Sequence, residues 1–166
     1  LDILVHSAGG PAPGTMLELA ESDWRAAFDI HVHPVFTLFR AAHPYLAREG
    51  GAVILISSVA GIRGCSGTVA YQTVKGALIP MIRAIAVEHA RYGLRANAIL
   101  PGWIATDMTA GAQDNDKFND NVIKRVPMRR WGKPADFGGM AVYFASDASA
   151  FHTGDSVLID GGYAIF

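Results

Sequence analysis

The sequence predicts an α/β protein built on a doubly wound, Rossmann-like parallel sheet. Two observations support this fold class. Four short runs rich in Val, Ile and Leu do not alternate with polar residues, which is typical of parallel strands covered on both faces. Long helical patterns separate most of these runs, as the βαβ series of such a sheet requires. The predicted strands are residues 1–5, 52–56, 95–100 and 156–159.

Three long helical patterns accompany the strands, with recognisable signals at their ends. Ser22 is a candidate N-cap for the first pattern, and Gly50 and Gly51 stop it. Gly93 is placed as the residue that closes the second pattern. The predicted helices are residues 22–48, 68–92 and 134–145, while residues 111–121 form a polar loop or short helix over one end of the sheet.

Two prolines interrupt these helical patterns. Pro34 has no N–H to bond the carbonyl of Ile30, and Pro80 leaves the carbonyl of Gly76 without its helical partner in the same way. Each proline therefore predicts a kink or a local opening of its helix.

The composition narrows the function classes. A hydrophobic share of 51% excludes a disordered chain. The balance of 14 Lys and Arg against 15 Asp and Glu argues against a nucleic-acid partner. No apolar run reaches the roughly 18 residues of a membrane span, so we expect no membrane association. The single cysteine, Cys65, allows no internal disulfide and fits a reducing compartment, which favours a cytoplasmic location.

The chain starts with Leu1 and directly in a strand pattern. We therefore expect residues 1–166 to be a single partial domain, cut from a larger one. Its length is that of one domain.

Small and polar residues gather where each predicted strand ends. In open parallel sheets, ligands bind beyond the carboxyl ends of the strands, so these segments are the first place to look for a site. Taken singly, each segment is also compatible with an ordinary turn. The segments are residues 6–10, 57–61, 101–106 and 160–162.

Tyr71 and Lys75 form the most specific pair. At positions i and i+4 of a helix they share a face. An ammonium group there stabilises a tyrosinate and so lowers the pKa of the phenol, which can then move a proton on or off a substrate oxygen. Alone, this spacing is equally typical of a solvated lysine beside a half-buried tyrosine.

Ser58 precedes Tyr71 by 13 positions and follows the second predicted strand. With this serine the chain resembles the short-chain dehydrogenase/reductase family over essentially all of its length. The features that match, in order, are the strand and turn of residues 1–9, Ser58, Tyr71, Lys75, Asn97, Pro101-Gly102, Thr106 and Asp160-Gly161-Gly162.

The resemblance implies roles for these residues. Tyr71 would be the general acid or base, Lys75 would hold the nicotinamide ribose and lower the pKa of Tyr71, and Ser58 would hydrogen-bond the substrate oxygen. The implied cofactor contacts are Ser7, Ala8, Gly9, Tyr71, Lys75, Pro101, Gly102, Ile104 and Thr106. For Asp160-Gly161-Gly162, packing is favoured over chemistry.

The chain departs from the family pattern in several places. The first three strands of the family's sheet and its glycine-rich turn are absent, so the chain has half of a cofactor site. His31 stands where the family usually has an Asn that helps hold a water-mediated proton path to the lysine, which makes His31 a candidate catalytic residue. His6 and Ser7 replace two further Asn. His31 and His33 lie at i and i+2, which do not face each other on a helix, so no metal site is predicted.

The function predicted on this basis is NAD(P)-dependent interconversion of a secondary alcohol and a ketone by hydride transfer. NAD and NADP both stay open, because the deciding residues would follow an absent strand. The substrate is a small molecule, with a 3-oxoacyl thioester and a sugar-type polyol both open. The resemblance also implies a homodimer or homotetramer for the full-length protein. The alternative is a catalytically inactive fragment that retains only oligomerisation surfaces.

Overall fold

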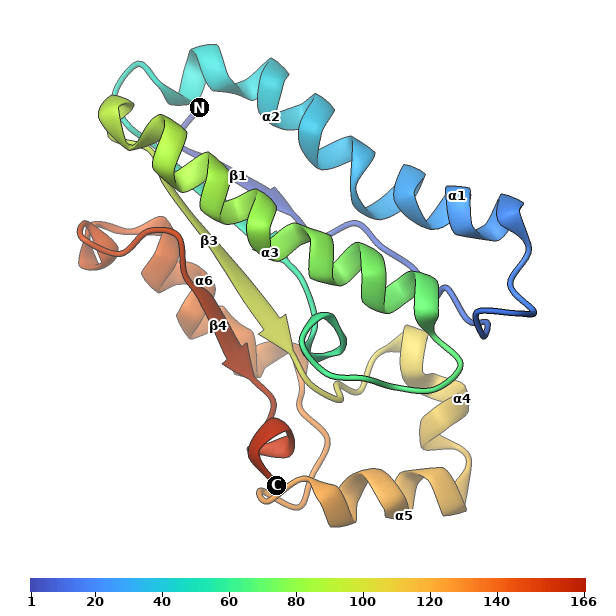
Figure 1. The fold of residues 1–166 in the computed structure, drawn as a ribbon. Coiled ribbons are helices and arrows are strands. Elements are labelled where there is room, and N and C mark those ends of the chain that lie inside the picture. Colours follow the sequence, from blue (N-terminus) through green and yellow to red (C-terminus); the bar gives the residue numbers. More distant parts are fainter.

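The computed structural model describes all residues from 1 to 166 and contains one four-stranded parallel sheet (Figure 1). The strands lie side by side in chain order, β1-β2-β3-β4, and each pairs with the next in parallel. Their bounds are β1 Ile3–His6, β2 Ala52–Ile56, β3 Arg95–Pro101 and β4 Ser156–Ile159. The predicted fold class and all four predicted strands are confirmed, with ends shifted by at most two residues.

Helices cover the sheet on both faces. The largest hydrophobic cluster lies between the sheet and α2 (His33–Leu46) with α3 (Val69–His89), whereas α6 (Gly138–Ala145) packs on the other face. Val53 and Leu55 of β2 belong to the first cluster and Ile54 between them to the second. Successive side chains of a strand point to opposite faces. Burial on both faces therefore explains why the strand runs do not alternate with polar residues.

The first predicted helix is two helices, α1 (Glu21–His31) and α2, separated at Val32. The amide of Val32 still bonds the carbonyl of Phe28, but Pro34 has no amide to continue the series. The break predicted from Pro34 is thus confirmed, and it lies two residues before the proline. The prediction of Ser22 as the N-cap is wrong. The N-cap of α1 is Ala20, and Ser22 lies within the first turn of the helix.

The second predicted helix matches α3, followed by a single 3₁₀ turn at Ala90–Tyr92. Gly93 has a φ of 74°, the left-handed conformation that glycine adopts without strain. Pro80 lies on the exposed side of α3 and does not end it, since Ile79 and Ile82 anchor the helix on the sheet.

The remaining helices follow β3. The polar stretch predicted as a loop or short helix contains α4 (Ala110–Gln113) and the start of α5 (Asp116–Arg125). Figure 1 shows both beyond the carboxyl ends of the strands. The third predicted helix begins as the 3₁₀ turn Pro134–Phe137 and continues as α6. None of the helices combines the length and apolar character needed to cross a membrane.

Candidate active site

The turn after β2 is locked onto α3. Ser57 Oγ donates a hydrogen bond of 2.7 Å to the carbonyl of Lys75. Gly61 approaches the backbone of Lys75 and Gly76 so closely that a β-carbon on it would lie 2.9 Å from the amide nitrogen of Gly76. Glycine is required where two backbones approach in this way. These contacts fix the segment around Ser58 against the turns of α3 that contain Tyr71 and Lys75.

Ser58, Tyr71 and Lys75 lie together. Ser58 is buried, and its Oγ accepts the amide of Ala60 at 3.1 Å, so the serine caps the short turn after β2. The same side chain lies near enough to the Tyr71 phenol to lower its pKa. Lys75 Nζ lies 5.8 Å from the centroid of the Tyr71 ring. The spacing read from the sequence therefore corresponds to one cluster of three functional side chains.

Burial raises the pKa of the Tyr71 phenol above its ordinary value, and the neighbouring Ser58 hydroxyl lowers it by a smaller amount. The expectation that Lys75 lowers this pKa is wrong for this structure. The ammonium group donates to the carbonyl of Ile56 at 2.8 Å, and its Nζ lies 5.8 Å from the centroid of the Tyr71 ring. Burial also lowers the pKa of Lys75 to about 8.

His31 is brought to the same place from the end of α1. Its ring is 1% exposed and lies edge-on to the Tyr71 ring, with the centroids 5.8 Å apart. His31 Nε2 lies 3.0 Å from the carbonyl oxygen of Gly10, in the turn after β1. His33 points elsewhere and pairs with Asp29 on the exposed side at 2.8 Å. Residues of β1, α1 and α3 thus meet at one end of the sheet.

The candidate cofactor residues lie in the turns after β1 and β3. Ser7, Ala8 and Gly9 form an exposed turn next to His31. After β3, Gly102 packs against Asp160, and a β-carbon on it would lie 2.5 Å from the Asp160 β-carbon. Three other predicted contacts, Pro101, Ile104 and Thr106, follow along the same turn. All of them are at the carboxyl ends of the strands, and the turn after β1 reaches the site, since a β-carbon on Gly9 would lie 3.5 Å from Lys75 Nζ.

Two predicted features have structural roles. Asn97 holds the loop before β4, since it donates to the carbonyl of His152 and accepts the amide of Asp155. Asp160 accepts the amides of Gly162 and Ala164 and so caps the last turn of the chain, which agrees with a packing role.

His6 also belongs to the site, although it was not among the residues predicted for it. His6 is 4% exposed at the end of β1, and neither of its ring nitrogens has a hydrogen-bond partner. Burial lowers the pKa of His6, and the neighbouring Lys75 ammonium lowers it further. A usable signal was present, because His6 and His31 both replace an Asn of the family pattern. Nothing in the sequence placed the two side chains beside the same lysine.

The two histidines make the stability of the protein sensitive to mild acid. Burial lowers the pKa of both, so the unfolded chain binds protons near pH 6.5 that the folded chain does not. The free energy of unfolding should therefore fall as the pH falls below about 6.5. We expect Tm, measured by circular dichroism, to drop by a few degrees between pH 7.5 and 5.5. In the double variant His6→Asn, His31→Asn most of that drop should vanish, and an equal drop in both proteins would contradict the assignment.

Comparison with known proteins identifies the family. The model described as "Enoyl-(Acyl carrier protein) reductase" matches residues 1–164. A 3-oxoacyl-[acyl-carrier-protein] reductase of Thermotoga maritima is 33% identical over 166 residues, which cover 99% of this chain and 67% of that protein. The chain belongs to the short-chain dehydrogenase/reductase family. The family expected from Ser58, Tyr71 and Lys75 is confirmed.

Other members of the short-chain dehydrogenase/reductase family are similar to a comparable degree. A 2-dehydro-3-deoxy-D-gluconate 5-dehydrogenase of Bacillus subtilis is 34% identical, over 98% of this chain and 65% of that protein. The crystal structure of a gluconate 5-dehydrogenase from Burkholderia cenocepacia, in complex with NADP and tartrate, superposes with a TM-score of 0.97 at 30% identity. That match covers 100% of this chain and 66% of the other. The chain thus spans about two thirds of the length of the relatives it matches.

Proposed function

We propose that the protein interconverts a secondary alcohol and a ketone, with Tyr71 as the proton-transferring residue. The observation that supports this most is the joint placement of Ser58, Tyr71 and Lys75, which three independent contacts hold in position. Two are the hydrogen bonds from Ser57 Oγ to the carbonyl of Lys75 and from Lys75 Nζ to the carbonyl of Ile56, and the third is the close approach of Gly61 to α3. Membership of an oxidoreductase family adds to this support.

The chemistry follows from the environments of the side chains. A neutral phenol at pH 7 is an acid, so Tyr71 donates its proton to the oxygen of a ketone during reduction and takes it back during oxidation. The hydroxyl of Ser58 binds the same oxygen and stabilises the negative charge that develops there. Bound NAD(P) supplies or accepts the hydride. A positive charge beside a phenol favours the tyrosinate, and Lys75 is a cation next to the Tyr71 ring that would contribute in this way.

The residues present fit a nicotinamide cofactor. The hydrogen bond to Ile56 uses one of the three donors of the Lys75 ammonium, and the other two can serve ribose hydroxyls. Gly10 has open space at the position of a β-carbon, so a ligand can approach the backbone of the turn after β1. The contacts we propose are Ser7, Ala8, Gly9, Tyr71, Lys75, Pro101, Gly102, Ile104 and Thr106.

Titration with NADPH and NADH, followed by nicotinamide fluorescence, tests the cofactor part of this proposal. We expect saturable binding of at least one, and about tenfold weaker binding in Lys75→Met, because a charged hydrogen bond contributes roughly 1.5–3 kcal/mol. Lys124→Met, on the exposed side of α5, is the matched control and should bind normally. If neither nucleotide binds, the chain is instead an inactive fragment with assembly surfaces.

The names of the relatives suggest two substrate classes to assay. One relative is named as a reductase of 3-oxoacyl groups on acyl carrier protein, and others are named as dehydrogenases of gluconate-type sugar acids. We propose that the substrate belongs to one of these classes. Turnover of NADPH or NADH with a 3-oxoacyl thioester and with a keto sugar acid, measured by absorbance, distinguishes them.

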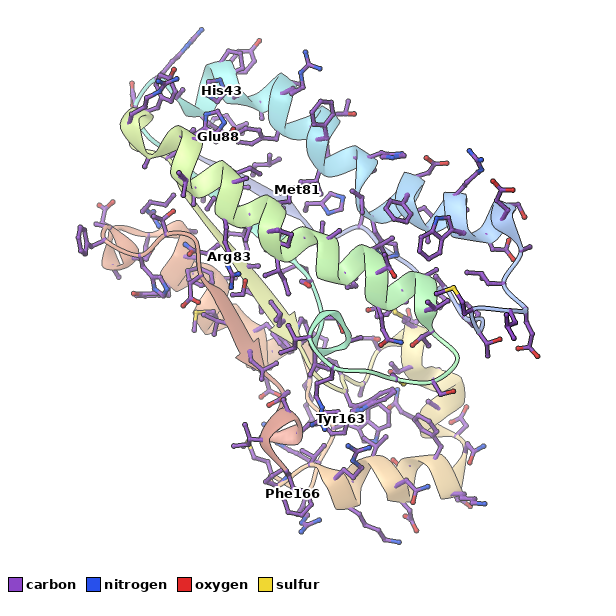
Figure 2. The ribbon with its side chains drawn as sticks, viewed as in Figure 1. His43, Met81, Arg83, Glu88, Tyr163 and Phe166 are labelled. Atoms are coloured by element: carbon purple, nitrogen blue, oxygen red, sulfur yellow. The ribbon has the colours of Figure 1, made fainter.

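We also propose that α2 and α3 pair with a second copy of the chain across a two-fold axis. A groove of about 430 Å³ lies between the two helices, and Figure 2 labels His43, Met81 and Glu88 along it. Its lining includes two exposed side chains of opposite charge, Arg40 on α2 and Glu88 on α3. In the two-fold contact that we propose, each of these groups faces the oppositely charged group of the partner, so the surface is complementary to itself. The lining residues are Val35, Phe36, Phe39, Arg40, His43, Met81, Ala84, Ile85, Glu88 and His89.

Charge reversal tests the pairing of these helices. We expect Arg40→Glu to weaken the dimer about tenfold in sedimentation equilibrium, because like charges then face each other. The double variant Arg40→Glu, Glu88→Arg should recover most of the affinity, since it restores opposite charges across the axis. A monomeric mass at micromolar concentration for the unmodified protein would rule out the pairing.

A further inference from the structure

Two histidines lie against each other in the groove between α2 and α3. His43 of α2 and His89 of α3 both line the groove, and their ring centroids are 4.6 Å apart. Phe39 packs edge-on against both rings, at 5.7 Å from His43 and 4.9 Å from His89. The Tyr92 ring lies edge-on to His43 at 5.3 Å. The histidine pair therefore lies among aromatic rings, on the surface where we propose that two chains meet.

One nitrogen of each ring is buried without a hydrogen-bond partner. These atoms are Nε2 of His43 and Nδ1 of His89. A neutral imidazole leaves at most one weak polar group unpaired in this position. A protonated imidazole carries an N–H donor at both nitrogens together with a positive charge, and burial of a charged donor without an acceptor is costly. Since an ordinary histidine titrates near pH 6.5, mild acid is enough to bring this cost into play.

The charged groups near the pair offer only one acceptor. Glu88 is the only acidic residue that lines the groove, and its carboxylate lies 3.7 Å from His89 Nε2. Arg40 lines the same groove, and Arg91 lies in the turn after α3. Burial lowers the pKa of His89, and His43 lowers it further; Glu88 acts in the opposite direction and Arg91 again lowers it. In acid, one carboxylate therefore faces the cation of Arg40 and two imidazolium rings.

We propose that His43 and His89 make the pairing of α2 and α3 with a second copy of the chain depend on pH, with a dimer at neutral pH that dissociates in mild acid. At neutral pH the rings are uncharged, and Glu88 is free to face the partner's Arg40. In acid the protonated His89 competes for that carboxylate, and the two-fold axis brings a second pair of charged rings to the same surface. This regulation rests on the pairing proposed above.

The sign of the effect follows from proton binding. In the separated chains the groove is open, and protonated rings can turn towards water. In the dimer the partner covers the groove, so the rings bind protons less readily. The separated chains therefore bind more protons than the dimer, and the dimer must lose affinity as the pH falls through and below about 6.5.

Sedimentation equilibrium at pH 7.5 and 5.5 tests this dependence on the whole chain. We expect the dissociation constant of the unmodified dimer to rise at least tenfold at pH 5.5. The double variant His43→Gln, His89→Gln should dimerise with nearly the same affinity at both pH values, because an amide does not titrate. His33→Gln is the matched control and should keep the full pH dependence, since His33 is exposed, pairs with Asp29 and lies outside the groove.

The outcomes separate this regulation from the pairing on which it rests. Circular dichroism at both pH values shows whether the chain stays folded, so that a lower mass reports dissociation rather than unfolding. Equal affinity of the unmodified protein at pH 7.5 and 5.5 would overturn the pH dependence and leave the pairing in place. A monomeric mass at both pH values would overturn the pairing, and the pH dependence with it.

Arg40→Glu provides a second test that does not alter either histidine. It places two carboxylates in the groove, so at neutral pH the charges of the two chains repel each other. Protonation of His43 and His89 then neutralises this excess of negative charge. We therefore expect the affinity of the Arg40→Glu dimer to rise from pH 7.5 to 5.5, opposite to the unmodified protein. A fall of the same size as in the unmodified protein would show that acid acts at other groups and would overturn the role of the two histidines.

Discussion

Replacing Tyr71 by phenylalanine should lower kcat by about 10³-fold, which is the contribution that a positioned acid or base typically makes. The change removes one oxygen atom and leaves the ring, which packs edge-on against His31, in place. Ser58 keeps its hydrogen bond from the amide of Ala60, so the turn after β2 should hold its position. The loss should therefore appear in turnover rather than in folding.

Cofactor affinity is the control for this variant. The donors of Lys75 do not involve the phenol, so Tyr71→Phe should bind NAD(P) within a few-fold of the unmodified protein. Tyr45→Phe, on the exposed side of α2, makes the same chemical change away from the site and should leave kcat unaltered. A Tyr71→Phe protein that turns over within a few-fold of the parent would refute the assignment of Tyr71 as the acid.

Much of the fold was readable because it depends on patterns local to each segment. Burial on both faces gave β2 and β3 continuous apolar runs, and the left-handed residue at Gly93 marks the end of α3. Ser58, Tyr71 and Lys75 were readable because one turn and one helix hold them at a fixed spacing. The separation of α1 from α2 at Val32 was predicted only in part. Pro34 shows that a helical hydrogen bond is lost, but it does not show at which residue the helix breaks.

The electrostatics of the site were not readable from sequence. A spacing of four residues suggested that Lys75 acts on the phenol of Tyr71, but the direction of the pKa shift depends on burial of the phenol and on the nearby Ser58. Both are set by how β2 packs on α3. The grouping of His6 with His31 likewise depends on contacts between β1 and α1, which are distant in the sequence. Electrostatic effects of this kind depend on how the strands and helices are arranged in three dimensions, and the sequence does not give that arrangement directly.

The close approach of Gly61 to α3 is another contact of this kind, and it leads to the second large effect. In Gly61→Ala the new methyl group would lie 2.9 Å from the amide nitrogen of Gly76 and 3.0 Å from the carbonyl oxygen of Lys75. Neither backbone atom can move without displacing α3 or the turn after β2. We expect the free energy of unfolding to fall by about 2–3 kcal/mol, the upper part of the range for overpacked interiors.

Displacement of that turn should also separate Ser58 from Tyr71 and lower kcat in the molecules that stay folded. Gly64→Ala is the matched control, because it lies three residues further along the same loop, has nothing within 4 Å of a β-carbon and has no positive φ. At this position the substitution mainly lowers the conformational entropy of the unfolded chain. It should therefore raise the free energy of unfolding by about 0.4–1 kcal/mol. Denaturant unfolding and kcat, measured on both variants, test this prediction. Equal free energies of unfolding in the two variants would mean that the turn after β2 is not locked onto α3. The cluster of Ser58, Tyr71 and Lys75 would then be held by other contacts.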